Sequence, residues 1–283
     1  MITDILKSIL YGIVEGITEW LPVSSTGHLI LLEKLVPFTN LQNSDDFFSM
    51  YEVVIQLGAI FAVLILFFNK LWPFKLNTEK AKGITPYLKL GTINLWGKVI
   101  VSVLPSAVIG LLLDDWLDAH LYNATTVSVT LILYGIFFIL VECWNKKRSP
   151  KVTSLENLSY GTAVLIGCFQ VLAMIPGTSR SGATILGAIL IGLSRPVAAE
   201  FSFFLAIPTM LGASLLKVVK YVGGGNSFSL NETVVLLIGM VVSFLVSVIA
   251  IKGLMAYVKK KDFSFFGYYR IVLGIIVLAL MVL

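Results

Sequence analysis

The stretch Glu15-Gly-Ile-Thr-Glu-Trp-Leu-Pro-Val-Ser-Ser-Thr-Gly-His28 interrupts an apolar segment with carboxylates, hydroxyls and an imidazole. A related stretch, Gln170-Val-Leu-Ala-Met-Ile-Pro-Gly-Thr-Ser-Arg-Ser-Gly182, interrupts a second apolar segment in the other half of the chain. Ionisable and hydroxyl groups at membrane depth are costly, so they are a functional-site hypothesis by default. An interruption that recurs in both halves indicates a site at the interface between two repeats.

The similarity between the halves extends beyond these stretches. One common offset pairs Pro22 with Pro176, Ser25 with Ser179, and 57–59 with 211–213. We therefore predict one membrane domain over 1–283, with internal repeats of approximately 1–145 and 155–283.

Composition indicates an all-α integral membrane protein. Hydrophobic residues make up 57% of the chain and charged residues only 13%, whereas soluble domains carry about 25% charged residues. Long apolar runs should be helical, because lipid offers backbone groups no hydrogen-bond partners. Cys143 and Cys168 lie in apolar runs, where we expect them to pack as small hydrophobic residues. Glu15 and Glu19 interrupt the first apolar run, so we do not expect it to be a cleaved signal peptide.

Segment lengths separate membrane spans from shorter hairpins. A helix needs roughly 20 residues to cross a bilayer, and six runs meet this requirement: 50–68, 97–113, 126–144, 200–219, 232–251 and 267–283. Four segments are too short or too broken to cross alone: 4–20, 23–36, 158–175 and 181–193. We predict that these four form two re-entrant hairpins that turn at Pro22 and at Pro176-Gly177. The alternative is a pair of ordinary spans with proline kinks.

Basic connections predict the orientation. Lysine and arginine concentrate in the connections 69–98, 145–157 and 252–266, which should therefore face the cytoplasm. We attribute the net charge of +5 to this topology and expect no nucleic-acid partner. The opposite face carries Asp114, Asp115 and Asp118, and both termini then lie outside. The first hairpin opens outward and the second inward, which predicts an inverted-topology repeat.

The first hairpin carries candidate metal and anion ligands. Glu15 and Glu19 are four residues apart and share a helix face, where two carboxylates could hold a hard divalent cation. They could instead bond to neighbouring helices or relay protons. Ser24, Ser25 and Thr26 precede an apolar run, so they would place hydroxyls and backbone N–H groups at a helix N-terminus. Such a terminus favours anions and is compatible with plain N-capping.

His28 and Arg180 complete the candidate site. His28 could be a general acid or base, a nucleophile or a metal ligand, whereas His120, in an acidic connection, fits a structural role. The planar guanidinium of Arg180 suits a phosphate or carboxylate, although it could form a structural bridge to Glu15 or Glu19. Thr178, Ser179 and Ser181 add hydroxyls beside it. Together these groups match the needs of phosphoryl transfer.

At these motifs the chain resembles the undecaprenyl-diphosphatase family, the bacterial enzymes linked to bacitracin resistance. The resemblance covers essentially the whole chain and implies hydrolysis of undecaprenyl diphosphate to undecaprenyl phosphate and inorganic phosphate. This reaction recycles the lipid carrier for peptidoglycan and other cell-envelope polymers, which supports cell-wall biogenesis and cell shape. The resemblance also implies a divalent cation, Mg²⁺ or Ca²⁺, and a multi-pass protein of the bacterial cell membrane.

The resemblance assigns roles residue by residue. It implies that Glu15 and Glu19 bind the cation and that the catalytic residues are Glu19, Ser25, His28 and Arg180. We expect the substrate to contact the hydroxyls of both tips and the guanidinium, namely Ser24, Thr26, Thr178, Ser179, Arg180 and Ser181. The nucleophile stays open between Ser25, His28 and a metal-activated water.

The mechanism that we favour from sequence has Ser25 activated by His28. The cavity should open to the outer side, and a homodimer is possible. A transporter or flippase of lipid phosphates is the main alternative, because broken helices in inverted repeats are typical of transporters.

Overall fold

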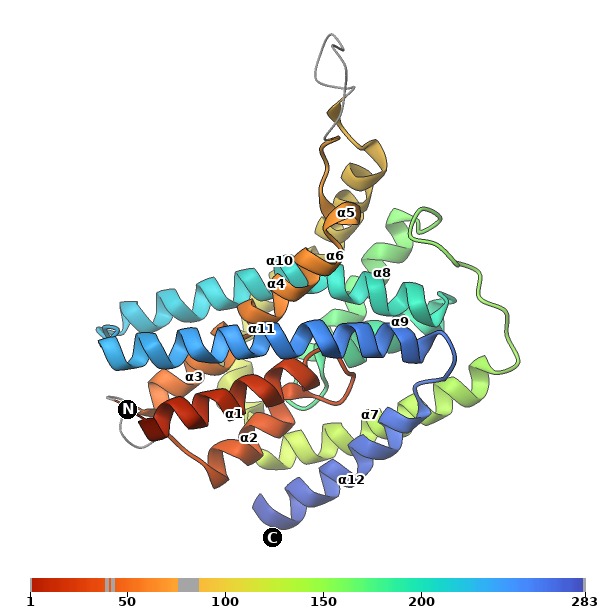
Figure 1. Cartoon of the computed structure of the whole chain (residues 1–283). Helices are drawn as coiled ribbons and strands as arrows, with labels where there is room; N and C mark the ends of the chain where they lie inside the picture. Colours follow the sequence, from red (N-terminus) through yellow and green to blue (C-terminus); the bar gives the residue numbers. More distant parts are fainter. Residues whose placement is uncertain (1, 39–40, 42–43, 76–86, 282–283) are drawn as a thin grey trace.

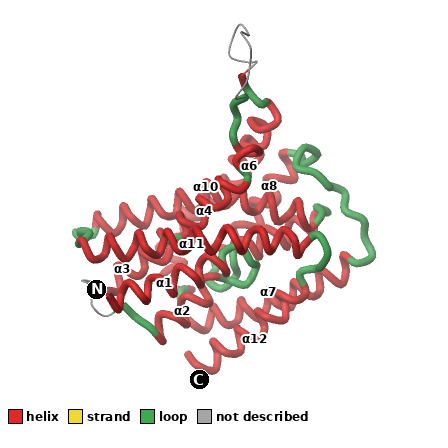
Figure 2. The backbone as a smooth tube through the Cα atoms, viewed as in Figure 1, coloured by secondary structure: helices red, strands yellow, loops and turns green. Residues whose placement is uncertain are grey.

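The computed structural model describes the whole chain except residues 1, 39–40, 42–43, 76–86 and 282–283. Its regular structure in the described part is helical, with two isolated β-bridges, and most helices pack side by side (Figures 1 and 2). The helices are α1 (Ile2–Thr18), α2 (Ser25–Leu35), α3 (Ser44–Val54), α4 (Gln56–Leu66), α5 (Phe68–Leu71), α6 (Leu90–Leu121), α7 (Ala124–Asn145), α8 (Tyr160–Val171), η2 (Leu172–Met174), α9 (Arg180–Ile191), α10 (Arg195–Gly223), α11 (Leu230–Val258) and α12 (Ser264–Met281).

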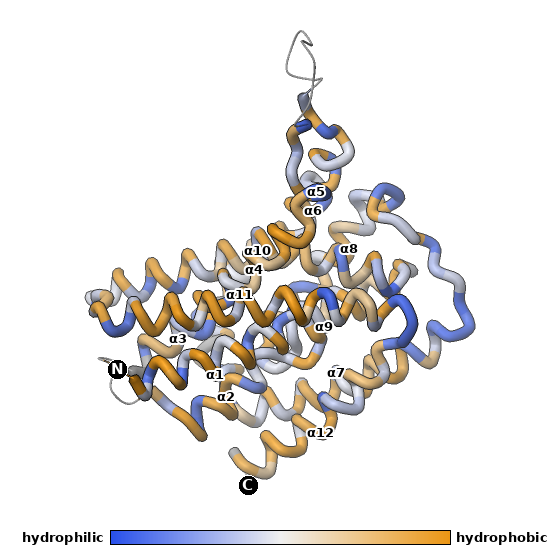
Figure 3. Tube along the Cα trace, viewed as in Figure 1, coloured by the Kyte–Doolittle hydropathy of each residue, from blue (hydrophilic) through white to orange (hydrophobic). Residues whose placement is uncertain are grey.

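Five stretches in the described residues are long and apolar enough to cross a membrane: Asp46–Leu66, Leu90–Leu113, Ala124–Asn145, Arg195–Gly223 and Leu230–Val258. Apolar colour covers most of their length in Figure 3, and polar colour gathers in the connections. They confirm an all-α membrane protein and correspond to five of the six predicted spans. The sixth prediction, 267–283, falls on α12, whose described apolar length places it among the shorter helices.

Helix boundaries differ from the prediction in several places. The first span is divided at Ile55 into α3 and α4, which the apolar run 50–68 did not indicate. Helix α6 continues to Leu121, well past the predicted end of its span, because the helix outlasts its apolar stretch. Hydropathy marks where a segment becomes polar, whereas a helix ends only where its backbone hydrogen bonds stop.

The four short segments form the expected pairs of helices. The first pair is α1 and α2, and the second is α8, extended by η2, and α9. Helix α1 packs against α11, and α8 packs against α6. Both contacts are close: a Cβ at Gly12 would lie 2.7 Å from the Gly239 carbonyl oxygen, and one at Gly167 would lie 2.1 Å from that of Ser102. Glycine permits such backbone approach between membrane helices. The inverted-topology repeat stays a prediction.

Two long helices carry an internal proline close to the interior of the bundle. Pro105 lies inside α6 and Pro208 inside α10. Proline removes a backbone donor and disturbs the preceding turn of a helix. Pro208 and Ser106, the residue after Pro105, both line the cavity described next.

Candidate active site

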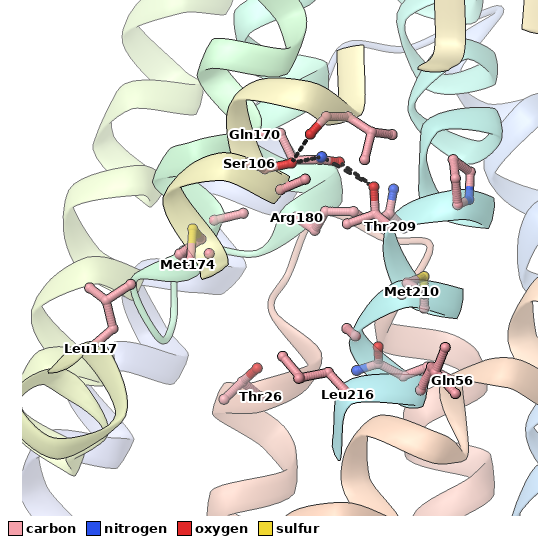
Figure 4. Close-up of a pocket in the computed structure, with 18 of the residues that line it drawn as sticks. Thr26, Gln56, Ser106, Leu117, Gln170, Met174, Arg180, Thr209, Met210 and Leu216 are labelled. Carbon is pink, nitrogen blue, oxygen red and sulfur yellow. Dashed lines mark hydrogen bonds between the residues drawn. The ribbon is translucent and has the colours of Figure 1, made fainter. Parts of the chain in front are cut away.

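A cavity of about 700 Å³ lies between the two hairpin tips and helices α6 and α10. Its polar lining side chains come from elements far apart in the sequence: Glu19, Ser25, Thr26, Gln56, Ser106, Gln170, Ser179, Arg180 and Thr209. In Figure 4, Arg180, Thr26 and Gln56 surround the same space as Ser106, Gln170 and Thr209. The structure therefore brings the two interrupted segments of the sequence to one place.

The lining becomes apolar farther along both long helices. Beyond Ser106 and Thr209, α6 and α10 contribute Ala107, Gly110, Leu111, Leu117, Gly212, Ala213, Leu215, Leu216 and Val219. We call this part the α6–α10 groove. At the end of this groove, Lys220 of α10 donates to Asp115 of α6 at 2.8 Å and links the two helices. A polar space continuous with an apolar groove can accept a charged group that carries a hydrocarbon chain.

Glu19 is the meeting point of the two hairpins. The Ser25 hydroxyl donates to Glu19 Oε2 at 2.9 Å, and Arg180 Nη2 donates to Glu19 Oε1 at 2.9 Å. The Ser181 hydroxyl donates to the Glu19 carbonyl oxygen at 3.0 Å. Glu19 is buried, so its charge requires this pairing. The bridge between Arg180 and Glu19 is the structural alternative considered for this arginine, and it is present.

Arg180 also holds α10 in place. Its Nη1 donates to the Ser202 carbonyl oxygen at 2.7 Å, and its guanidinium lies over the Trp20 ring at 5.7 Å. The buried Nε of Arg180 has no partner among the described residues. One donor of the guanidinium is therefore uncommitted in a side chain that lines the cavity.

Serine residues cap the helix at each hairpin tip. Ser24 and Ser179 precede α2 and α9, and their hydroxyls accept from the Gly27 and Gly182 N–H groups at 3.3 and 3.1 Å. The plain N-capping alternative therefore holds for Ser24. The sequence offset had paired Ser25 with Ser179, whereas the shared capping role pairs Ser24 with Ser179, one residue earlier in the first tip.

The remaining tip hydroxyls are divided between cavity and interior. Thr26 lines the cavity together with Ser179, whereas Thr178 and Ser181 are buried and outside the lining. Ser181 is occupied by the Glu19 carbonyl. Direct contact with a ligand in the cavity is thus open to Thr26 and Ser179, and Ser24, Thr178 and Ser181 lie behind them.

Glu15 lies deeper than Glu19 and does not line the cavity. It is fully buried, and neither carboxylate oxygen has a hydrogen-bond partner among the described residues. A buried carboxylate without partners is costly unless a proton or cation neutralises it. The described residues contain no group of three or more His, Cys, Asp or Glu side chains placed for a metal. By residue type, the two carboxylates Glu15 and Glu19 are the hard oxygen ligands that a divalent cation prefers, and other oxygens would have to complete its coordination.

The mechanism favoured from the sequence required His28 to contact the Ser25 hydroxyl, and the structure does not place it there. Its Nδ1 hydrogen-bonds with the Ser24 carbonyl oxygen at 2.7 Å, and its Nε2 with the Tyr269 hydroxyl at 2.7 Å. The His28 and Tyr269 rings stack with centroids 5.6 Å apart. The imidazole thus faces α12 and is absent from the cavity lining. The His120 ring contacts Trp116, one helical turn earlier.

The chain matches the family model described as bacitracin resistance protein BacA over residues 8–276. It belongs to the BacA family. A BacA-family relative named undecaprenyl-diphosphatase, from Enterococcus faecalis, is 56% identical over 280 residues, which cover 98% of both chains. Proteins of the same name from Acetivibrio thermocellus and Lacticaseibacillus casei are 56% and 54% identical, over 97% and 98% of this chain and 96% and 98% of their own lengths.

Two residues of the candidate site were missed from the sequence. Arg270 of α12 is fully buried and donates to the Gly177 and Pro22 carbonyl oxygens at 2.8 and 3.3 Å, so it joins the two tips. Gln170 donates to Ser106 at 2.7 Å and to Thr209 at 3.2 Å on the cavity wall (Figure 4). Arg270 could have been noticed as a charge within an apolar run. Gln170 begins the second interrupted stretch, but it is uncharged and was not selected as a site residue.

Proposed function

We propose that this protein hydrolyses undecaprenyl diphosphate to undecaprenyl phosphate and inorganic phosphate, thereby recycling the lipid carrier of cell-envelope polymers and conferring bacitracin resistance. Membership of the BacA family and the name shared by its relatives support this activity. The observation that carries it is the Glu19 carboxylate, bonded to both Ser25 and Arg180 where a polar cavity joins an apolar groove. The transporter alternative has no support from the relatives.

The polar part of the cavity matches the diphosphate of the substrate, and the α6–α10 groove matches its hydrocarbon chain. The diphosphate would lie among Arg180, Thr26 and Ser179, because guanidinium and hydroxyl donors suit phosphate oxygens. The first isoprene units would lie in the α6–α10 groove, where burial of apolar surface favours them.

Ser25 is placed to act as the nucleophile. Its hydroxyl already donates to Glu19 Oε2, so Glu19 can accept the proton as Ser25 Oγ attacks the terminal phosphorus. The bond to the bridging oxygen breaks, and undecaprenyl phosphate leaves. Water then attacks the phosphoserine, the phosphorus–Oγ bond breaks, and Ser25 Oγ takes back the proton held by Glu19 as inorganic phosphate leaves. This geometry favours Glu19 over His28 as the proton acceptor, because neither ring nitrogen of His28 contacts Ser25.

Glu15 and Glu19 would hold a divalent cation, Mg²⁺ or Ca²⁺. When bound, such a cation neutralises phosphate charge and polarises the phosphoryl group. The buried oxygens of Glu15 support this role, since they accept no hydrogen bond from the described protein groups.

The cavity would open to the outer side of the cell membrane. The groove lies toward the ends of α6 and α10 that are remote from the basic connections, and those connections predict the cytoplasmic face. The diphosphate carrier is released on the outer side after polymer assembly, so this placement would meet the substrate where it forms.

A direct assay tests the function. The purified protein in detergent should release inorganic phosphate from undecaprenyl diphosphate, and Glu19→Gln should abolish release while the protein stays folded. Membrane-spanning transport cannot occur in detergent, so phosphate release separates an enzyme from a transporter. Absence of release from the unmodified protein, with added Mg²⁺ or Ca²⁺, would overturn the proposal.

A further inference from the structure

A second cavity, of about 480 Å³, lies away from the candidate active site. Three connections form it: the end of α7 with the residues after it, the α9–α10 junction, and the α11–α12 junction. Its charged lining residues are Lys146, Arg148, Arg195, Lys259, Lys260, Lys261 and Asp262. We call it the basic cavity. The basic cavity contacts the start of α10, at Ser194–Pro196. The α6–α10 groove contacts the same helix from Pro208 onward, about 20 Å farther along its axis.

The positive charge of the basic cavity is largely uncompensated. Arg195 is committed to the buried Glu142, with Nη2 2.5 Å from Oε2. Lys146 lies 3.9 Å from Asp262, the one acidic lining residue among those described. Lys259, Lys260 and Lys261 show no acidic partner in the described part of the chain. Cytoplasmic loops attract positive charge in membrane proteins generally. That tendency does not require the charges of three separate connections to face one cavity.

A helix terminus adds to the positive potential. Ser194 is the N-cap of α10 but makes no side-chain capping hydrogen bond, and Ser194, Arg195 and Pro196 all line the cavity. The N-terminus of a long helix carries a partial positive charge. The Glu142 carboxylate also accepts from the Phe263 N–H group at 3.1 Å, which ties the α11–α12 junction to Arg195. These contacts hold the connections that carry the basic side chains in fixed positions relative to one another.

An interfacial aromatic residue places the basic cavity at the depth of lipid headgroups. Trp144 is 41% exposed in the last turn of α7, and the Arg148 guanidinium lies 3.6 Å from the centre of its ring. Exposed tryptophan is typical of the membrane–water interface. A basic pocket between transmembrane helices at that depth is suited to an anionic lipid headgroup.

We propose that the basic cavity binds the phosphodiester headgroup of an anionic membrane lipid and thereby joins the ends of α7, α10 and α11. The phosphate oxygens would accept from Lys259, Lys260, Lys261 and Arg148, and the acyl chains would remain in the surrounding leaflet. A free phosphate ion shares the same chemistry. The interfacial position favours the lipid, because a headgroup is held there by its own chains. This site is separate from the proposed hydrolysis and does not depend on it.

The experiment compares ligands and charge-removal variants of the whole protein in detergent. Thermal midpoints and native mass spectra are recorded with phosphatidylglycerol, with phosphatidylcholine of the same chains, and with inorganic phosphate at matched ionic strength. The test variant is Lys259→Gln/Lys260→Gln/Lys261→Gln. The control variant, Lys147→Gln/Lys151→Gln/Lys252→Gln, removes equal charge from basic residues outside the lining. Phosphate release from undecaprenyl diphosphate reports that both variants are folded.

Phosphatidylglycerol should raise the midpoint of the unmodified and control proteins more than phosphatidylcholine does. It should bind the test variant about tenfold more weakly, or worse. Equal binding to both variants would overturn the proposal, as would equal effects of the two lipids. If inorganic phosphate stabilises the unmodified protein but not the test variant, and phosphatidylglycerol stabilises neither, the lipid proposal is overturned. The ligand of the basic cavity is then a soluble anion. If the test variant fails to fold, Arg148→Gln provides the same comparison with one charge.

Discussion

Ser24 and Ser179 share a positive backbone φ, of 73° and 72°, one at each hairpin tip. They are the only described residues other than glycine with positive φ. Each precedes the first helical residue of its tip, and those residues, Ser25 and Arg180, are the two that bond to the Glu19 carboxylate. Strained backbone of this kind tends to cluster at functional sites. Here it directs the start of each helix toward one carboxylate.

The strain predicts an unusual response at Ser24. Both Ser24→Ala and Ser24→Gly remove the capping hydroxyl. Alanine at this position still has an unfavourable positive φ, whereas glycine adopts a positive φ without strain. Ser24→Ala should therefore be less stable than Ser24→Gly by about 1 kcal/mol or more. Thermal midpoints in detergent measure the difference. Ser229, the ordinary N-cap of α11 with φ of −71°, is the control and should show a narrower gap. Equal gaps at the two positions would contradict the strain argument.

Arg180 should not be replaceable by lysine. Its guanidinium contacts Glu19 and Ser202 at once, and an ammonium group on a flexible stem cannot reproduce both contacts. Arg180→Lys should lower the rate of phosphate release by about a hundredfold. Arg148→Lys, an exposed change outside the candidate active site, should leave the rate unchanged. Near-normal turnover in Arg180→Lys would mean that only the charge matters.

The hydrogen bond from Ser25 to Glu19 predicts the nucleophile. Ser25→Ala should be almost inactive, and rapid quenching of the unmodified protein should trap phosphoserine. His28→Ala and Tyr269→Phe should each retain measurable activity, because their mutual contact lies outside the cavity. An acid-labile phosphohistidine, with activity remaining in Ser25→Ala, would instead identify His28. If no covalent species forms, an activated water is the nucleophile.

The two glutamates should differ in their effect on the cation. Glu19 bonds to Ser25 and Arg180, so Glu19→Gln should abolish activity at any cation concentration. Glu15 makes no such bonds, and Glu15→Gln should mainly raise the Mg²⁺ or Ca²⁺ concentration needed for half-maximal activity, by about tenfold. Phosphate release is measured across a cation titration. An unchanged titration in Glu15→Gln would remove that residue from the metal site.

Single cysteines test the sidedness. In a Cys143→Ser/Cys168→Ser background, needed because both native cysteines are exposed, Asn123→Cys should react with a membrane-impermeant thiol reagent in cells without an outer barrier. Thr153→Cys, in a basic connection, should not react. Labelling of Thr153→Cys alone would invert the topology and place the cavity on the cytoplasmic side.

Sequence patterns predicted the spans and the hairpin tips because both depend on local composition. Apolar length is enough to mark a helix such as α11, and a polar cluster after Pro22 is enough to mark a turn. The break at Ile55 was missed, because neither proline nor glycine stands at Ile55 or directly beside it. The sequence left the N-cap open among Ser24, Ser25 and Thr26, and the backbone of the structure assigns it to Ser24.

The contacts of the site residues were harder to predict than which residues belong to the site. Arg180 and Glu19 were both selected from sequence, but which oxygen receives which donor depends on how the hairpins meet. Arg270 illustrates the limit, because its partners are backbone carbonyls, which every residue has. His28 shows the opposite error: nearness in sequence to Ser25 suggested a contact, whereas one helical turn directs its ring toward Tyr269.

The α6–α10 groove is a slot without a closed wall. Leu111 and Leu215 line it and yet are 78% and 66% exposed, and a Cβ at Gly212 would meet no atom within 4 Å. A volume of about 700 Å³ suits a small ligand, so an undecaprenyl chain cannot be enclosed whole. The substrate can therefore enter edgewise from the bilayer, with no threading of its chain. Recognition then falls on the diphosphate and the nearest isoprene units, while the rest of the tail stays dissolved in lipid throughout the reaction.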